Sequence, residues 1–599
     1  MNTESKSEIN PVDLAIMANR MEAICREMTN TMLLTARSSV IGMARDFSCA
    51  IITADNQVLS VAESIPIHAL GMDMQFSDIA KHHPDFKEGD AFLHNDPYSG
   101  NTHAADHTIL IPVFYENTHC FTVGVKAHQA DTGNSLPTTY MAPAKDIYNE
   151  GTLIFPGVKV QENYQDNEDI IRMCKRRIRV PEQWYGDYLA AIGSARIGER
   201  GCKAFAEKYG IKNSILFQSE WLNYSERRTA DAIKKLPKGS LNGNLSHDPM
   251  DPWIPERLDV KVKISIDPDD ALITVDLRDN IDCIDAGLNL TEATATMAAS
   301  QGVIHCLNDD VPPNAGTLRR IKVLLRDGCV VGKPKFPHSC SMATTNLTDI
   351  IINVTLSSFA ELKEGLGFAH GNYCNSAASG VASGTDSRKK SEPFINQMFM
   401  MGGGGGASAT TDGSHYLFTP VGAGVLYRDS VEINEQRFPI KIDYMKLVQD
   451  SMGHGKRRGG PATEVQMGPR SEHMSILHAC NGLETSPKGV RGGTDSKLGS
   501  NIKITPDGKL HPYPAVMMCE LEPGEVLRAR DQGGGGYGYP WERETERVLK
   551  DVKNKIISIE TAFDIYGVML SGSEDDDSLN IDYEQTSKKR YELSSNLKN

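Results

Sequence analysis

Glycine runs in the C-terminal half constrain the fold of this 599-residue chain more than any other feature of its sequence. The longest runs are five glycines at 402–406 and four at 533–536. Glycine contributes no side chain to a core, so these stretches cannot form an amphipathic helix or a well-packed strand. They indicate backbone that either turns with positive φ or approaches another group closely. From residue 370 to about 545 we therefore expect short β elements and no long helix.

The N-terminal third, in contrast, has clear helix and strand patterns. Asn10 followed by Pro11 is typical of a helix start, with Asn as N-cap and Pro at the first helical position. Apolar residues then recur every three or four positions, as on one face of a long amphipathic helix; they are Met17, Met21, Ile24, Met28 and Met32. Alternating apolar residues predict paired strands at 46–61, 108–125 and 260–277. Helical patterns occupy 165–235 and 291–307.

Shifts in composition divide the chain into four predicted domains, the first of which ends near Pro252 and Pro255. They are an N-terminal α/β metal-binding domain at 1–250, a mixed α/β domain at 251–390, a glycine-rich β domain at 391–545, and C-terminal helices with a charged tail at 546–599. The tail from Ser571 onward is expected to be solvated and disordered, because it is rich in charge. The predicted fold class is α+β, multidomain, with a short helical C-terminus.

The charge balance and the apolar pattern exclude several classes of protein. Lys and Arg number 63 and Asp and Glu number 78, so the net charge of −15 disfavours a nucleic-acid or anionic-membrane binder. No apolar run approaches about 18 residues, which disfavours a membrane protein, and the N-terminal residues do not resemble a secretion signal. Twelve cysteines without a C-x-x-C motif indicate reduced, buried thiols. We expect a cytoplasmic protein.

Potential metal ligands are concentrated between residues 95 and 131. His103 and Asp106 lie in a loop that leads into a predicted strand, and His128 ends the next strand, so hairpin pairing can bring it to the same end of the sheet. Imidazole and carboxylate suit a divalent metal of borderline softness. Asp46, at the start of an earlier strand, can complete the set. His68 is a further candidate, as a ligand or as a general base.

The same residues also allow a purely structural interpretation. His103 would then cap a turn, Asp106 would accept backbone hydrogen bonds and His128 would be a core histidine, because His-x-x-Asp lacks the specificity of H-E-x-x-H. His107 and Asp131 are expected next to the ligands or in structural roles, since a ligating histidine needs an outer acceptor.

The glycine runs do not form a recognisable nucleotide site. The motif G-x-x-x-x-G-K-[ST] is absent, and no clear strand precedes the five-glycine run. The basic residues 456–458, which lie beside two glycines, could face an anion or form a solvated turn. We expect that this chain does not bind ATP by itself.

Several motifs together resemble the hydantoinase B/oxoprolinase family, in order and spacing, from about residue 10 to 570. They include D-F-S-C-A at 46–50, I-P-I-H at 65–68, N-D-P-Y-x-G-x-T-H-x-x-D at 95–106, K-A-H-x-x-D-x-G at 126–133, V-P-E at 180–182, P-N-x-G at 313–316, D-S-x-G-x-G-K-x-R-G-G at 450–460, G-G-G-G-Y-G at 533–538 and Y-G-V at 566–568. This family comprises B-type subunits of ATP-dependent hydantoinases and caprolactamase, the C-terminal half of 5-oxoprolinase, and subunits of acetone and acetophenone carboxylases.

The resemblance implies a divalent metal, zinc or manganese, held by His103, Asp106 and His128. In relatives, an acidic residue near the D-F-S strand is a fourth ligand, and Asp46 is the acid available here. We assign catalytic roles to His68 and Asp131. Asn101 stands where glycine is commoner in the family, and its position beside a ligand is expected to alter substrate fit.

The resemblance also assigns ATP to a partner, the hydantoinase A-type kinase-like subunit, and so implies a hetero-oligomer. The leading prediction is the metal-containing subunit of a cyclic-amide hydrolase, which hydrolyses a phosphorylated, imidate-like intermediate made by that partner. A subunit of an ATP-dependent ketone carboxylase is the first alternative, because the same ligands can stabilise an enolate. A non-catalytic scaffold with a structural metal is the second.

Overall fold

The computed structural model describes residues 9–62, 65–69, 71–307, 310–373, 376–417, 419, 426–573 and 578–595. The fold is α+β, with several sheets and short C-terminal helices, which confirms the predicted fold class. Apolar side chains collect in separate cores that follow one another along the chain. The predicted domain boundaries stay predictions.

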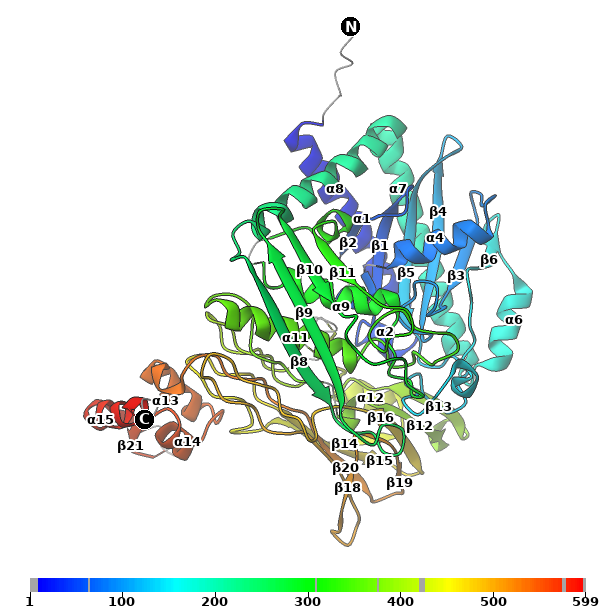
Figure 1. Ribbon diagram of the computed structural model, residues 1–599. Coiled ribbons are helices and arrows are strands. Elements are labelled where there is room, and N and C mark those ends of the chain that lie inside the picture. The colour runs from blue at the N-terminus through cyan, green and yellow to red at the C-terminus, as the bar shows by residue number, and fades with distance from the viewer. Residues whose placement is uncertain are drawn as a thin grey trace.

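The N-terminal part consists of one antiparallel sheet between helices. Its elements are α1 (Pro11–Thr35), α2 (Ser39–Gly42), β1 (Phe47–Thr53), β2 (Val58–Ala62), α3 (Pro66–Ala69), α4 (Met72–His82), β3 (Ala91–His94), β4 (Asp106–Tyr115), β5 (Thr118–His128), α5 (Ile147–Glu150), β6 (Val158–Glu162), β7 (Gln165–Asp166), α6 (Glu168–Arg177), α7 (Pro181–Tyr209) and α8 (Ile211–Ile233). The strand order is β2-β1-β5-β4-β3-β6-β7 (Figure 1).

The long N-terminal helix forms as predicted. The Asn10 side chain accepts hydrogen bonds from the amides of Val12 and Asp13, at 3.1 and 3.0 Å. The predicted methionine-rich face is buried, and it packs with α7 on one side of the sheet. The short helix α4 covers part of the other side with Met72, Phe76 and Ile79.

The middle part is a second sheet packed against helices. Its elements are β8 (Gly239–His247), β9 (Leu258–Asp267), β10 (Leu272–Asp276), α9 (Glu292–Ile304), α10 (Ala315–Leu318), β11 (Ile321–Leu324) and α11 (Leu347–Leu362). The strand order is β11-β10-β9-β8, and α9 and α11 pack against each other over an apolar core. The predicted strands at 260–277 and the predicted helix near 291–307 are confirmed.

The glycine-rich part contains short strands, as expected. Its elements are η1 (Ala377–Ser379), β12 (Val381–Asp386), η2 (Ser387–Lys389), β13 (Glu392–Gln397), α12 (Val431–Arg437), β14 (Ile440–Leu447), β15 (Thr463–Pro469), β16 (Met474–Ala479), β17 (Ser500–Ile504), β18 (Leu510–Tyr513), β19 (Val516–Leu521) and β20 (Val526–Arg530). They form two sheets, β13-β12-β16-β19 and β14-β15-β20-β17-β18, with a common apolar core.

The glycine runs approach one another as paired backbone segments, which we call the glycine bundle (residues 402–407, 453–460 and 532–538). The amide of Gly404 donates to the carbonyl of Gln532 at 3.0 Å, and the amide of Gly534 donates to the carbonyl of Gly460 at 2.9 Å. None of the glycines in 402–406, 459–460 and 533–536, all of them described, has a positive φ. Of the two alternatives left open by the sequence, close approach is therefore correct, and backbone is what these runs approach.

Glycine is required in the bundle because no space remains for a side chain. A Cβ added to Gly406 would lie 1.8 Å from the carbonyl oxygen of Ala369, and one added to Gly404 would lie 1.9 Å from that of Gly460. Real Cβ atoms never approach carbonyl oxygens that closely. The segments are thus held by hydrogen bonds between main chains rather than by apolar side chains.

A buried ion network ties the C-terminal helices to this bundle. Arg543 is 1% exposed, and its guanidinium lies 2.7 Å from a carboxylate oxygen of both Asp412 and Asp551. Arg458 pairs with Asp551 at 3.1 Å. The basic residues 456–458 are therefore not simply a solvated turn, because the last of them is buried in an ion pair.

The C-terminal elements project from one side of the molecule (Figure 1). They are η3 (Pro540–Glu542), α13 (Thr545–Lys553), α14 (Ile559–Asp564), β21 (Met569–Ser571), β22 (Asn580–Asp582) and α15 (Tyr583–Ser595). The prediction of a disordered tail is wrong for 578–595, because Leu579 and Thr586 are buried against a small core and the Arg590 side chain donates to the carbonyl of Tyr566 at 3.0 Å. The acidic run at 574–577 and the N-terminal residues 1–8 lie outside the described residues.

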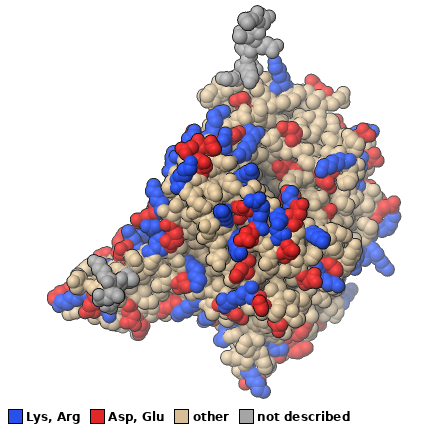
Figure 2. Space-filling model, viewed as in Figure 1, with Lys and Arg blue, Asp and Glu red and all other residues tan. Residues whose placement is uncertain are grey.

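Cysteine and charge patterns agree with the sequence analysis. All cysteines in the described part of the chain are free, and each except Cys283 is buried. Within the described ranges, no helix combines the length and the apolar character needed to cross a bilayer. On the face shown in Figure 2, Lys and Arg side chains are interspersed with Asp and Glu side chains.

Replacing Gly534 with alanine tests the glycine bundle. The new Cβ would lie 1.9 Å from the carbonyl oxygen of Gly405. Neither main chain can move without breaking bundle hydrogen bonds. We therefore expect the free energy of unfolding to fall by about 3 kcal/mol or more, measured as a lower Tm or as insoluble protein. Gly193→Ala in α7 is the control, because that Cβ meets nothing within 4 Å and should stabilise the helix by up to about 1 kcal/mol. Wild-type stability of G534A would contradict this view of the bundle.

Candidate metal centre

The register of three neighbouring strands brings the predicted ligands together. Asp106 at the start of β4 pairs with His128 at the end of β5, and the His128 amide donates to the carbonyl of Asp46 at 3.0 Å. Successive side chains of a strand point to opposite faces. Asp106 and His128 therefore share one face, and their neighbours His107 and Ala127 point to the other.

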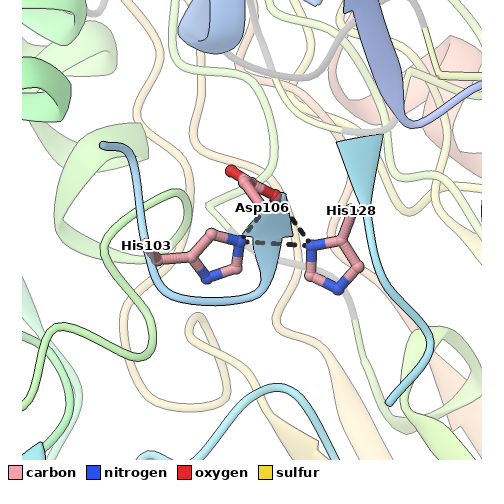
Figure 3. A group of neighbouring side chains, drawn as sticks. All are labelled: His103, Asp106 and His128. Carbon is pink, nitrogen blue, oxygen red and sulfur yellow. Dashed lines mark hydrogen bonds and ion pairs between the residues drawn. The ribbon is translucent and has the colours of Figure 1, made fainter. Parts of the chain in front are cut away.

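His103, Asp106 and His128 form one compact group of ligand atoms (Figure 3). Nε2 of His103 lies 3.0 Å from Oδ1 of Asp106 and 3.1 Å from Nδ1 of His128. Nδ1 of His128 lies 3.2 Å from Oδ1 of Asp106. All three side chains are buried. Residues that are separate in the sequence thus present two nitrogens and one oxygen to a common point.

The hydrogen bonds around the imidazoles show that this point suits a cation. Nδ1 of His103 donates to the carbonyl oxygen of Ser341 at 2.8 Å, so in the neutral ring Nε2 carries a lone pair. Nε2 of His128 is hydrogen-bonded to the Thr139 hydroxyl at 2.9 Å, which leaves Nδ1 for the centre. Lone pairs that face each other at these distances require a proton or a metal ion between them. The donor set fits a divalent metal of borderline softness.

The charges of the centre depend strongly on one another. Burial would raise the pKa of Asp106, but His103, His68 and His128 hold it well below its usual value. Burial would lower the pKa of His103, but the Asp106 carboxylate outweighs this effect and the pKa is raised. Asp46 differs, because its burial dominates and raises its pKa. Asp106 is therefore the ionised carboxylate at the centre of the group.

Asp46 and His68 lie beside the three-residue group. Nε2 of His68 is 3.1 Å from Oδ2 of Asp106 and 3.9 Å from Oδ1 of Asp46. Asp46 is 5% exposed and close enough to His128 and His68 for their charges to lower its pKa. Nδ1 of His68 is buried without a hydrogen-bond partner in the described part of the chain. Both residues are brought to the centre, and their roles as ligand or base stay predictions.

Asp131 and His107 are placed away from the group of ligand atoms. Asp131 accepts hydrogen bonds from the Gly133 amide at 3.1 Å and from the amide and guanidinium of Arg179 at 2.5 and 3.1 Å. These contacts favour a role in fixing a turn, and the predicted catalytic role of Asp131 stays untested. His107 faces the α7 side, where its Nδ1 accepts from the Trp184 indole at 3.3 Å, and burial lowers its pKa to about 3.

Asn101 braces the loop that carries His103 and Asp106. Its Nδ2 donates to the carbonyls of His103 and Asp106, at 2.6 and 2.9 Å, and its Oδ1 accepts from Gln75 at 3.1 Å. The Thr102 hydroxyl also donates to the Asp106 carboxylate. These contacts give Asn101 a positioning role, and the predicted effect on substrate fit stays a prediction.

Sequence reasoning missed several residues that complete the centre. Ser341 and Thr139 orient the two imidazoles, and the Tyr140 ring stacks on His128 with centroids 5.1 Å apart and an interplanar angle of 18°. In the sequence, Lys126 stands out only as the first residue of the K-A-H-x-x-D-x-G motif. Burial lowers its pKa to about 8, against the influence of nearby carboxylates. None of these residues has a spacing that indicates its role.

Comparison with known proteins places the chain among enzymes. The family model for hydantoinase B/oxoprolinase matches residues 10–540. The caprolactamase subunit beta of Pseudomonas jessenii is 27% identical over 576 residues, which cover 94% of this chain and 97% of that protein. The 5-oxoprolinase of Dictyostelium discoideum is 23% identical over 548 residues, which cover 89% of this chain and 40% of that protein.

Solved structures share the same fold. The ATP-dependent caprolactamase from Pseudomonas jessenii matches with a TM-score of 0.87 and 25% identity, over 97% of this chain and 100% of that one. Nucleotide-free acetone carboxylase matches with a TM-score of 0.87 and 17% identity, over 98% of this chain and 83% of that one, which shows a common fold. Since the family model spans most of the chain, the chain belongs to the hydantoinase B/oxoprolinase family.

Proposed function

We propose that this chain is the metal-containing subunit of an ATP-dependent cyclic-amide hydrolase. The substrate class is a hydantoin, an oxoproline or a lactam, activated by phosphorylation on a kinase-like partner subunit. The observation that carries the proposal is the buried convergence of His103, Asp106 and His128 on one point, in a chain of this family. Such a convergence of lone pairs is costly unless it binds a cation.

In this proposal, His103, Asp106 and His128 hold a divalent metal, zinc or manganese, and Asp46 completes the set. The ion supplies Lewis-acid chemistry, which stabilises negative charge as it develops on oxygen. Ser341 and Thr139 keep the two imidazoles in the tautomers that direct lone pairs inward. Asn101 holds the loop that carries His103 and Asp106 in place.

His68 is suited to the role of general base. Its Nε2 lies 3.1 Å from Oδ2 of Asp106, so a neutral ring donates there and leaves the lone pair on Nδ1. That Nδ1 has no other partner among the described residues. It can accept a proton from an attacking water, while Asp106 fixes the ring and stabilises the imidazolium that forms.

The activation step belongs to another chain in this proposal. The sequence lacks a phosphate-binding fingerprint, and the glycine runs approach backbone rather than present an open cradle. The relative from Pseudomonas jessenii is named as a subunit, and its solved structure is named as ATP-dependent. We infer a hydantoinase A-type partner, a hetero-oligomer and a cytoplasmic location, where ATP is available.

Ketone carboxylation is the second candidate function. The fold match to acetone carboxylase favours it, at the level of fold. The same ligands suit either reaction, because both develop negative charge on an oxygen bound to the reacting carbon. A non-catalytic scaffold would need a closed metal site, in which all coordination positions are filled by protein.

Replacing His128 with alanine tests the catalytic proposal. We expect the variant to lose its metal, measured by elemental analysis, and to lose ring-opening activity, while the partner subunit still hydrolyses ATP. His473→Ala is a matched control, because His473 is half-exposed, pairs with Glu520 and directly precedes β16, which belongs to another sheet. Unchanged turnover by H128A would refute the assigned role, and lost metal with unchanged turnover would support the scaffold.

Replacing Asp46 with asparagine tests the fourth ligand. Removal of a ligand or its close support weakens metal binding by about 10–100-fold or more, so D46N should bind metal more weakly than wild type in a chelator competition. Asp106→Asn is the reference for loss of a central ligand. Wild-type metal affinity in D46N would show that Asp46 does not coordinate the ion.

Labelled bicarbonate separates the two candidate reactions. The complex is incubated with ATP and either hydantoins and lactams or ketones, and the products are counted for carbon-14. A hydrolase releases ADP with ring-opened product and incorporates no label. Incorporation of label into a ketone substrate would overturn the hydrolase assignment and establish the carboxylase.

A further inference from the structure

A second polar row lies next to the metal centre on the same face of the N-terminal sheet. Lys126 precedes His128 by two residues on β5 and so points to the same side. Its Cα partners are Ser48 on β1 and Thr108 on β4. The short helices α3 and α4 belong to this side, with His68 and Gln75 reaching Asp106 and Thr108. Lys126 is therefore enclosed between the sheet and the α3–α4 corner.

The ammonium of Lys126 has no hydrogen-bond partner in the described part of the chain. Its side chain is fully buried, and Nζ makes no hydrogen bond. The carboxylates whose charges act on it are Asp106 and Asp73. Asp106 is already engaged by imidazoles and Thr102, and Asp73 accepts from the Met74 amide at 3.0 Å, at the start of α4. Burying an ammonium without an acceptor is strongly unfavourable, so the geometry indicates that an acceptor is missing here.

Two residues near Lys126 also carry an unpaired atom, which in each case is a hydrogen-bond acceptor. Oε1 of Gln75 and Nδ1 of His68 are buried without a hydrogen-bond partner in the described ranges. The Gln75 amide cannot simply be turned over, because its Nε2 donates to Asn101 and Thr108, both at 3.1 Å.

 Of these three unpaired atoms, Nζ of Lys126 is the donor, so it is the atom that an anion would contact.

The charge around this corner favours an anion. Burial raises the pKa of Asp46, and the Asp106 carboxylate is already engaged by three imidazoles, at 3.0–3.2 Å. Asp73 accepts a hydrogen bond from the Met74 amide in the first turn of α4, but burial raises its pKa. The positive charge of Lys126 is then left without a counterion. A phosphoryl group supplies both negative charge and strong acceptor oxygens for an ammonium.

We propose that Lys126 is the cationic end of an anion subsite, which holds the phosphoryl group of the activated intermediate beside the metal centre. The inference rests on the proposed function, because that function supplies a phosphorylated substrate. It adds Lys126 as a substrate-binding residue that contacts the phosphoryl group, which leaves during the reaction. Lys126 is then a determinant of specificity for the phosphorylated over the free cyclic amide.

Inorganic phosphate is the probe that tests this subsite. The full-length, metal-loaded chain is titrated with phosphate by calorimetry, and metal content is measured in each sample. We expect Lys126→Met to weaken phosphate binding at least about tenfold, since a charge-assisted hydrogen bond is lost, with metal content unchanged. Lys159→Met is the matched control, because Lys159 lies on the same sheet, on β6, but pairs with Asp90 at 2.9 Å. This control should bind phosphate as wild type does.

Kinetics with the partner subunit give a second readout. K126M should lower kcat/KM for ring opening by a similar factor, while ATP hydrolysis by the partner continues. Lys126→Gln keeps a polar group and serves if the Met variant does not fold. Wild-type phosphate affinity in a folded Lys126 variant, or no phosphate binding by the wild-type chain, would overturn the inference. Neither result touches the proposed function, which is tested separately by the turnover of H128A and by labelled bicarbonate.

Discussion

The centre depends on the pairing register of β1, β5 and β4. His128 meets Asp106 because β5 pairs residue for residue with β4, and the same register brings the Asp46 carbonyl to the His128 amide. A slip of one residue would turn every side chain of β5 to the other face. His128 would then point into the apolar core under α7, and the ligand set would be lost. The chemistry of the site is thus a consequence of strand pairing.

Much of this arrangement could be predicted from local patterns. The N-cap at Asn10, the β1–β2 hairpin and the β4–β5 hairpin follow from residue types and short-range periodicity. Hairpin geometry also accounts for the meeting of His128 with Asp106, since adjacent strands bring distant residues to one edge. The meeting of the candidate ligands could therefore be predicted from the sequence, whereas a bound metal could not.

The remaining parts depend on contacts between segments far apart in the chain. Ser341 orients His103 across 238 positions, and no pattern in the sequence links these residues. Lys126 looks like an ordinary strand residue until its burial is known. The tail is rich in charge, yet Leu579 and Thr586 are buried in it and Arg590 bonds to the carbonyl of Tyr566. Propensity is local, whereas burial and unpaired charge are properties of the whole fold.

The glycine bundle differs from an ordinary core in how it can change during evolution. In a core of side chains, an enlarged residue can be accommodated when a neighbour becomes smaller. In the bundle, the neighbour is a main-chain carbonyl, as that of Gly405 is to Gly534, and no substitution makes a carbonyl smaller. Second-site suppressors of a bundle substitution should therefore be absent at the contact itself. Rescue would instead require a shift of a whole main-chain segment, which the hydrogen bonds of the bundle resist.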